Sequence, residues 1–340
     1  MNPSGALLRP RNPDGATFLV AGGAGFIGSH LVDLLLRRYP AARVLTLDRL
    51  TYAGSLDNLE EALDDPRHEF VQGDICDRRL ASRLAARADF VLNLAAETHV
   101  DRAILDGEPF ARTDALGTAV LLEAFRQAGR GQCFVQVSTD EVYGPIPAGE
   151  VDEDAPLAPK NPYAASKAAG DLLCLAYKAT HRLPVLISRG ANTYGPRQHR
   201  EKMIPTFVRA ALAGEALPIY GDGLQVREWL HVRDHCEALD FLLRLGSPGG
   251  VYNVGSGDRR TNLEVAGKLL ALVERATGRR GAVGQVADRP GHDRRYAVDS
   301  TRLRDLGWKP RTPLGAGLEE TVEALLPGRV SRRRSPVASS

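Results

Sequence analysis

Cysteine is scarce in this sequence, and the few thiols stand far apart. Cys76, Cys133, Cys174 and Cys236 form no C-x-x-C pair and match no spacing of metal ligands. This pattern excludes a disulfide scaffold and a metal site held by cysteines. We therefore expect no bound metal, reduced thiols and a cytoplasmic protein.

Long apolar runs and a strong net charge are also missing. No stretch approaches ~18 uncharged apolar residues, so we expect no membrane span. Residues 1–15 contain no apolar h-region and are interpreted as a flexible leader rather than a signal peptide. The net charge of +2 gives no global field that would indicate a nucleic-acid partner. The basic run at 332–334 lies in a tail, 327–340, that we expect to be disordered.

What the sequence does contain is a repeated alternation of short apolar runs and helical patterns. The runs are apolar throughout, as is typical of parallel strands covered by helices on both faces. The sequence therefore predicts an α/β fold with a doubly wound parallel sheet, the Rossmann arrangement, over residues 16–193. We expect strands at 17–21, 43–47, 70–71, 90–94, 134–137 and 185–188.

The alternation weakens after Asn192, where prolines and glycines break the chain into short pieces. Helical patterns return at 232–245, 263–277 and 314–325. We interpret 194–326 as a smaller C-terminal α/β lobe, to which the family resemblance described below assigns the binding of a nucleotide sugar. Part of 225–250 is expected to return to the first domain.

A glycine-rich turn, Gly-Gly-Ala-Gly-Phe-Ile-Gly at 22–28, lies between the first strand and a helical pattern. Gly22, Gly25 and Gly28 let the backbone turn sharply and approach a pyrophosphate, whose charge then lies at the helix N-terminus. The strand on one side and the helix on the other are the context that this fingerprint requires. The sequence therefore predicts a dinucleotide site, with a plain helix-packing turn as the alternative.

Two acidic residues extend this site. Asp48 follows the second strand, 20 residues after Gly28, where a carboxylate can bind the ribose hydroxyls and would repel a 2′-phosphate. This favours NAD over NADP, although the neighbouring Arg49 weakens the preference. Asp74, after the third strand, is placed to reach the adenine.

Tyr163 and Lys167 are spaced i, i+4, so both lie on one helix face. An ammonium beside a phenol lowers the pKa of the phenol, and the phenolate can take a proton from a sugar or alcohol hydroxyl while hydride leaves for nicotinamide. Such pairs also occur by chance on helix surfaces. A catalytic role for this pair is favoured because the pair follows both a dinucleotide fingerprint and Ser138 at a strand end.

Asp140 and Glu141 directly follow Thr139 at the end of the same strand. Two adjacent carboxyl groups can have different pKa values, which provides one acid and one base. The alternative is a helix N-terminus that carries acids because they are electrostatically favourable there. The pair alone leaves both interpretations open.

The sequence around these residues resembles the extended short-chain dehydrogenase/reductase superfamily and, within it, the dTDP-glucose 4,6-dehydratases. The resemblance covers roughly 17–325 and rests on E-T-H-V-D-R at 97–102, T-D-E-V-Y-G at 139–144 and Y-x-x-x-K at 163–167. T-D-E is the specific part, because related epimerases and decarboxylases generally lack the Asp-Glu pair.

The resemblance implies a reaction in which NAD⁺ accepts hydride from C4 of the hexose and later returns it to C6. Tyr163 is then the base at the C4 hydroxyl, Lys167 tunes it, and Thr139 hydrogen-bonds near the C4 oxygen. Glu141 removes the C5 proton and Asp140 protonates the departing C6 hydroxyl. The cofactor is regenerated in each turnover and stays bound.

The resemblance also implies two binding sets. The NAD set is Gly22, Gly25, Phe26, Ile27, Gly28, Asp48, Thr51, Asp74, Ile75, Leu94, Ala95, Ala96, Thr98, Thr113, Tyr163, Lys167 and Thr193. The dTDP-glucose set is Thr98, Thr139, Asp140, Glu141, Asn192, Lys202, Met203, Pro218, Tyr220, Arg227, Asn262, Arg289 and His292. Arg227 is favoured as the diphosphate clamp, because a guanidinium binds phosphate oxygens in bidentate fashion.

The sequence departs from the family pattern at Ala103, Thr193 and Arg200, which puts the finer substrate contacts in doubt. His231 and His235 are spaced like some metal ligands but have no third ligand. The family also implies a homodimer through helices near 113–127 and 163–181. The other functions considered are a nucleotide-sugar epimerase or decarboxylase and, in another class, a non-catalytic NAD-binding scaffold.

Overall fold

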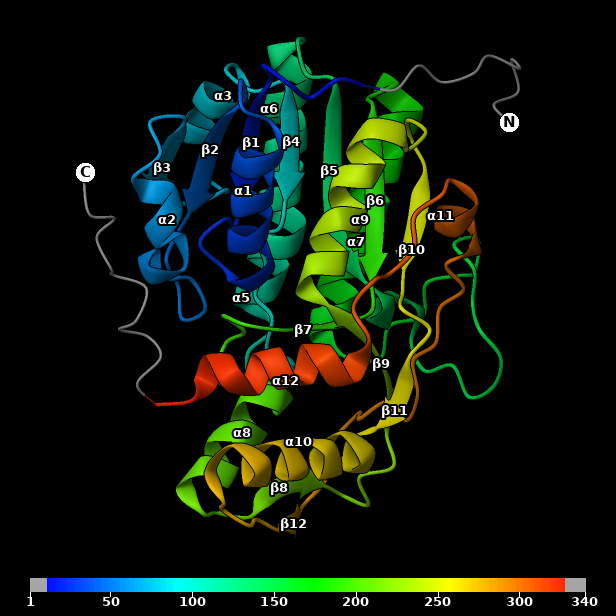
Figure 1. Cartoon of the computed structure of the whole chain (residues 1–340). Helices are drawn as coiled ribbons and strands as arrows, with labels where there is room; N and C mark the ends of the chain where they lie inside the picture. The colour runs from blue at the N-terminus through cyan, green and yellow to red at the C-terminus, as the bar shows by residue number, and fades with distance from the viewer. Residues whose placement is uncertain (1–10, 328–340) are drawn as a thin grey trace, which may run out of the picture.

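The computed structural model describes residues 11–327 and contains a large parallel sheet (Figure 1). The strand order is β10-β6-β5-β4-β1-β2-β3, with every neighbouring pair parallel. This order confirms the doubly wound Rossmann fold. The strands are β1 (Thr17–Ala21), β2 (Arg43–Asp48), β3 (His68–Gln72), β4 (Phe90–Asn93), β5 (Cys133–Thr139), β6 (Val185–Gly190) and β10 (Val251–Val254).

Helices cover both faces of this sheet, which explains why its inner strands are apolar throughout. On one face, α1 (Phe26–Arg38) packs against α9 (Val232–Leu245) over a core that includes Phe18, Leu35 and Leu239. On the other face, α3 (Arg78–Ala85), α6 (Thr118–Ala128) and α7 (Pro162–His181) cover a second core.

Short elements fill the connections at the carboxyl edge of the sheet. A π-helical turn, η2 (Ala111–Gly117), leads into α6, and a 3₁₀ turn, η3 (Asp140–Tyr143), follows β5. The remaining short elements are η1 (Leu56–Leu59), α2 (Glu60–Leu63), α4 (Val100–Leu105) and α5 (Glu108–Phe110).

A smaller lobe lies below the sheet in Figure 1, built around α8 and α10 with α12 between the lobe and the sheet. Its own core includes Tyr194, Phe207 and Leu269. Two small sheets, β11-β9-β7 and β12-β8, complete it. Its elements are β7 (Asn192–Tyr194), α8 (Met203–Ala213), β8 (Leu217–Tyr220), β9 (Val226–His231), β11 (Arg259–Thr261), α10 (Asn262–Thr277), β12 (Val283–Val286) and α12 (Leu314–Leu325).

The chain passes between the lobes more than once. After β9 it returns to the large sheet through α9 and then β10, which pairs with β6 as the edge strand. The return therefore extends just past the range 225–250, because β10 begins at Val251. A short helix, α11 (Thr301–Asp305), also packs on β10.

Residues 11–15 are the described part of the expected leader, and Arg11 at its start lies against the end of α9. The Arg11 backbone N–H donates to the Arg244 carbonyl at 3.0 Å, and its guanidinium donates to the carbonyls of Leu243 and Gly246. The rest of the leader and the basic run at 332–334 lie outside the described residues. Within 11–327, no helix combines the length and apolar character that crossing a membrane requires.

Candidate active site

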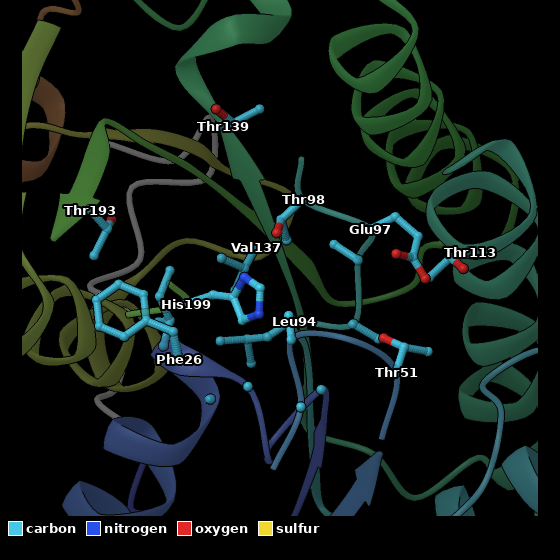
Figure 2. Close-up of a pocket in the computed structure, with 18 of the residues that line it drawn as sticks. Phe26, Thr51, Leu94, Glu97, Thr98, Thr113, Val137, Thr139, Thr193 and His199 are labelled. Carbon is cyan, nitrogen blue, oxygen red and sulfur yellow. The ribbon is translucent and has the colours of Figure 1, made fainter. Parts of the chain in front are cut away.

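A cleft opens at the carboxyl ends of the large sheet, where ligands bind in folds of this kind. Its walls come from sheet loops and from segments leading to the smaller lobe (Figure 2). Many of the residues singled out in the sequence lie together here. They are Gly22, Gly25, Phe26, Ile27, Gly28, Asp48, Thr51, Asp74, Ile75, Leu94, Ala95, Ala96, Thr98, Thr113, Thr139, Glu141, Tyr163, Lys167, Asn192, Thr193 and Lys202.

The glycine turn at one end of the cleft has no room for side chains at two positions. Gly22 has φ +78°, and a Cβ there would lie 2.6 Å from the Ala95 backbone nitrogen. A Cβ on Gly28 would lie 2.2 Å from the Gly22 carbonyl oxygen. Helix α1 begins here with no side-chain cap and no acid in its first turn. Its N-terminal N–H groups therefore suit an anionic group.

Asp48 lies at the end of β2 and holds the glycine turn in place. Its carboxylate accepts hydrogen bonds from the backbone N–H groups of Ala24 at 2.9 Å and Leu50 at 2.8 Å. Burial raises the pKa of this carboxyl. The Arg49 guanidinium lies 3.6 Å from the Asp74 carboxylate and is 57% exposed. The Asp74 carboxylate therefore partly neutralises Arg49, which reduces the attraction of this guanidinium for a further anion.

Tyr163 and Lys167 lie on the first turns of α7, which Asn161 caps by accepting a hydrogen bond from the Ala164 N–H at 2.8 Å. The Lys167 ammonium donates to the Val137 carbonyl at 2.7 Å. Burial and the nearby acids Glu141, Asp114 and Asp140 hold the pKa of the Tyr163 phenol well above 10. The expectation that Lys167 lowers this pKa is therefore wrong for the chain by itself, because desolvation and three carboxyl groups oppose it.

Asp140 and Glu141 form the start of η3, directly after β5. Glu141 lines the cleft, whereas Asp140 lies behind the cleft wall and is only 2% exposed. Burial and the charges of Glu141 and Glu228 raise the pKa of Asp140 to about 8. The two carboxyl groups thus occupy different environments, one open and one enclosed, as an acid and base pair requires.

A buried network of polar side chains connects the elements that carry Tyr163 and Glu141. The Arg189 guanidinium on β6 donates to Asp171 on α7 at 2.9 Å and to the Tyr143 hydroxyl in η3 at 2.8 Å. Tyr143 in turn donates to the Asn253 side chain on β10 at 2.8 Å. The network joins α7, which carries Tyr163, to η3, which carries Glu141, and ties both to strands β6 and β10. It therefore fixes Tyr163 and Glu141 relative to one another.

The other substrate residues singled out in the sequence lie outside the cleft wall, mostly between the lobes. The Arg289 guanidinium and the Tyr220 hydroxyl approach the Asp101 carboxylate at 3.2 and 3.4 Å. The His292 ring meets Tyr220 edge-on at 6.1 Å. Met203 begins α8 and Pro218 lies on β8. Among residues 11–327, buried polar atoms of Asn262 and Arg289, and of Asn192 on the cleft wall, have no hydrogen-bond partner, so a ligand could satisfy them.

Arg227, the favoured diphosphate clamp, is largely buried in this structure. Its guanidinium stacks over the Tyr296 ring at 4.4 Å and donates to the Val226 and Asp293 carbonyls at 2.9 Å. The Tyr296 hydroxyl lies 2.7 Å from the Asp293 carboxylate and 3.3 Å from that of Glu141. Arg227, on β9 of the smaller lobe, is thus anchored against Tyr296, whose hydroxyl also reaches Glu141.

Sequence reasoning missed several cleft residues. Glu97 lies four residues after β4, so its place at the carboxyl edge was a usable signal; burial raises its pKa. His235 lies in the first turn of α9 and contacts the Thr193 hydroxyl at 2.8 Å. His231, which is not among the cleft residues, caps that helix by accepting the Arg233 N–H. His199, edge-on to Tyr52 at 5.4 Å, lies in an irregular loop that no local pattern marks.

Comparisons with known proteins agree with this geometry. A family model described as GDP-mannose 4,6 dehydratase matches residues 19–321. A low-salt glycan biosynthesis protein, Agl12, from Haloferax volcanii is 53% identical, covering 91% of this chain and 98% of that protein. A dTDP-glucose 4,6-dehydratase from Actinoplanes sp. is 49% identical, covering 89% of this chain and 96% of that protein.

A solved structure shows the same likeness in three dimensions. DesIV, a dTDP-glucose 4,6-dehydratase from Streptomyces venezuelae crystallised with NAD bound, is 45% identical with a TM-score of 0.87. The match covers 93% of this chain and 98% of that one. The chain belongs to the GDP-mannose 4,6-dehydratase family and, within it, to the dTDP-glucose 4,6-dehydratases.

Proposed function

We propose that this chain converts dTDP-glucose to dTDP-4-keto-6-deoxyglucose with a resident NAD. The carrying observation is Glu141 on the cleft wall with Tyr163 and Lys167, at the cleft that also contains the glycine turn, with the enclosed acid Asp140 directly before Glu141 in η3. Hydride exchange alone needs one base at the hydroxyl. An additional acid and base are what elimination of water requires.

The residues present fit NAD. The crowded Gly22 and Gly28 leave backbone exposed to a pyrophosphate at the start of α1, and Asp48 is placed for the ribose hydroxyls. Arg49 is turned to Asp74, which supports NAD over NADP. When bound, NAD supplies the hydride acceptor for C4 and the hydride donor for C6. The remaining NAD contacts fall to the cleft residues from Thr51 to Thr193 named above.

The chain's own residues move the protons. Tyr163 takes the proton of the C4 hydroxyl, with Lys167 and Thr139 on the same cleft wall. The positive charges of Lys167 and of a bound NAD⁺ would favour its phenolate against the burial that raises its pKa. The resulting ketone makes the C5 proton acidic, and Glu141, on the cleft wall, removes it. Asp140, protonated because of its burial, gives a proton to the departing C6 oxygen. Glu141 then returns its proton to C5.

The nucleotide diphosphate is assigned to the smaller lobe, over 194–326. Arg289, His292 and Tyr220 gather near Asp101, and the unpartnered buried atoms of Asn262 and Arg289 favour a polar ligand between the lobes. Lys202, half-buried and bonded to the Thr98 carbonyl, lies where both lobes meet the cleft. The four thiols are unpaired, which supports a reducing compartment such as the cytoplasm.

One experiment distinguishes the proposed dehydratase from an epimerase and from a non-catalytic NAD-binding scaffold. Purified protein is incubated with dTDP-glucose, and the products are followed by NMR. The 4-keto-6-deoxy product is expected without added cofactor, because NAD is regenerated in each turnover. A C4 epimer of the substrate would instead indicate an epimerase. An NAD-loaded protein that leaves dTDP-glucose unchanged would support the non-catalytic scaffold.

The pH dependence follows from the enclosed acid. Asp140 must hold a proton when elimination begins, and its pKa is raised to about 8. Turnover is therefore expected to fall as pH rises through about 8, approaching roughly tenfold per pH unit as the carboxyl ionises. Product formation measured from about pH 6 to about pH 10, with bound NAD checked at each pH, decides this. A rate that stays constant to about pH 10 contradicts the assignment.

The same shift has a defined sign for stability. The folded-state pKa of Asp140 lies above the ordinary value of 3.8, so the folded protein holds a proton that the unfolded chain has lost. Stability from this group is fully present below the ordinary pKa. It declines as pH rises towards about 8.

We infer that two copies associate through α6, α7 and the neighbouring turn η2. Leucines stay exposed on α4, η2 and α7, with Leu105 at 88%, Leu116 at 43% and Leu172 at 57%. Elements α4 and η2 pack on α7, so these side chains belong to adjoining elements. Leu172→Glu is expected to convert a dimer to a monomer in sedimentation, whereas Leu306→Glu, on α11's C-terminal side, is the matched control. A monomeric starting protein would contradict the interface.

A further inference from the structure

The segment between β7 and α8, residues 195–202, forms part of the cleft wall without being a helix or a strand. Its Gln198, His199 and Lys202 line the same cleft as the glycine turn. Figure 2 shows His199 among the side chains that line this cleft. We call residues 195–202 the strap, because the segment is attached to the Rossmann domain near both of its ends.

The first attachment fixes the start of the strap to α1, the helix that follows the glycine turn. The Arg197 guanidinium donates to the Asp33 carboxylate at 2.7 Å, and both side chains are half-buried, at 24% and 18% exposed. The His30 ring donates to the Pro196 carbonyl at 2.9 Å. Arg197 has φ +67°, a left-handed conformation that is unfavourable for an arginine. The contacts to α1 must offset this cost, so breaking the ion pair should loosen the strap.

The second attachment fixes the end of the strap to α4 and to the loop after β2. The Arg102 guanidinium on α4 donates two hydrogen bonds to the Glu201 carboxylate, at 3.1 and 2.6 Å. The same guanidinium lies over the Tyr52 ring at 4.2 Å, and the Tyr52 hydroxyl accepts the Thr98 N–H at 3.0 Å. Lys202 donates to the Thr98 carbonyl. One arginine therefore ties the strap to two other segments of the cleft wall.

The two attachments are made to different elements of the Rossmann domain, and the cleft-lining part of the strap lies between them in the sequence. A dinucleotide in the cleft therefore lies against a segment that cannot move away while both attachments hold. We propose that the strap retains NAD, and that the ion pairs Arg197–Asp33 and Arg102–Glu201 set the rate at which NAD leaves. This inference rests on the proposed function, in which one NAD serves every turnover.

NAD release from the loaded protein tests the strap without relying on turnover. Protein purified with NAD bound is mixed with excess ADP-ribose, which blocks rebinding, and free NAD is followed over time by chromatography. Arg197→Asp places a like charge opposite Asp33 and is expected to release NAD about tenfold faster. Aspartate tolerates the left-handed conformation better than most residues, so backbone strain does not grow. The reversed pair, Asp33→Arg with Arg197→Asp, should return release to within about threefold of the native rate.

Two further variants make the measurement specific to the strap. Arg102→Leu removes the second attachment, in which the side chains are 48% and 30% exposed, and is expected to speed release about threefold. Arg87→Glu places a like charge opposite Glu69 in a surface ion pair at β3, away from the strap. This control should release NAD at the native rate.

Native release rates in both Arg197→Asp and Arg102→Leu would overturn the strap. Faster release in Arg197→Asp that the reversed pair does not correct would overturn it as well, because the ion pair itself would then not matter. Arg102→Leu, at the exposed attachment, decides the question if Arg197→Asp does not fold. Protein that retains NAD and shows the expected release rates, but forms no 4-keto-6-deoxy product, would overturn the proposed function instead.

Discussion

Glu141→Gln is expected to lower turnover by about 10³-fold while the oxidation at C4 still occurs. The amide has nearly the size of the carboxylate but cannot take the C5 proton. Glu141 lies on the cleft wall, and its neighbour Tyr296 approaches it at 3.3 Å through a hydroxyl that can bond an amide equally well. The fold and the cofactor site should therefore survive the change.

The measurement follows the two halves of the reaction separately. Mixing the variant with dTDP-glucose should produce the near-ultraviolet absorbance of reduced nicotinamide, while 4-keto-6-deoxy product and water loss stay near background. Glu69→Gln, an exposed acid on β3 paired with Arg87, is the matched control and should behave like the unmodified protein. Equal loss of oxidation and elimination in Glu141→Gln would contradict the role assigned to this carboxylate.

Tyr163→Phe is expected to stop the reaction one step earlier, with a loss of about 10³-fold or more. Removing the phenol oxygen removes the group that we propose as the base at the C4 hydroxyl. Lys167, whose ammonium donates to the Val137 carbonyl, cannot replace it, because a protonated amine has no lone pair to accept a proton. Oxidation and elimination should therefore disappear together.

The same absorbance experiment distinguishes this variant from the first. Tyr163→Phe should show no reduced nicotinamide after mixing, whereas Glu141→Gln should accumulate it. Tyr177→Phe removes a hydroxyl from the same helix, where the phenol lies 3.4 Å from Glu123 at the surface, and serves as the control. Reduced cofactor appearing at the native rate in Tyr163→Phe would show that another group takes the C4 proton.

Most of the fold follows from local pattern. The apolar run at 17–21 coincides with β1, and the helical pattern at 232–245 coincides with α9. The buried side chains of these segments recur with the period of a strand or a helix, so the sequence pattern predicts the element directly. The edge strand β10 was not expected, because four residues between two loops carry little pattern of their own. Its pairing with β6 depends on tertiary packing.

The site also has features that local sequence pattern predicts and features that depend on tertiary packing. Residues that follow a strand at the carboxyl edge, such as Asp48 and Glu141, could be found because strand ends in a parallel sheet meet at one edge. The pKa of Tyr163 could not, because it depends on burial and on Asp114, a residue from a distant helical turn. Nor could the enclosure of Asp140, since Glu228 approaches it from β9, far along the chain.

The late return of the chain to the large sheet also orders events during synthesis. Strand β10 is the last strand of that sheet in the sequence. It pairs with β6 although the whole β7–β9 segment lies between these two strands in the chain. Until residue 254 has left the ribosome, β6 is an open edge with unpaired backbone groups. The nascent sheet therefore stays incomplete until its own last strand, made after the β7–β9 segment, has been synthesised, and truncated chains ending before Val251 should aggregate rather than fold.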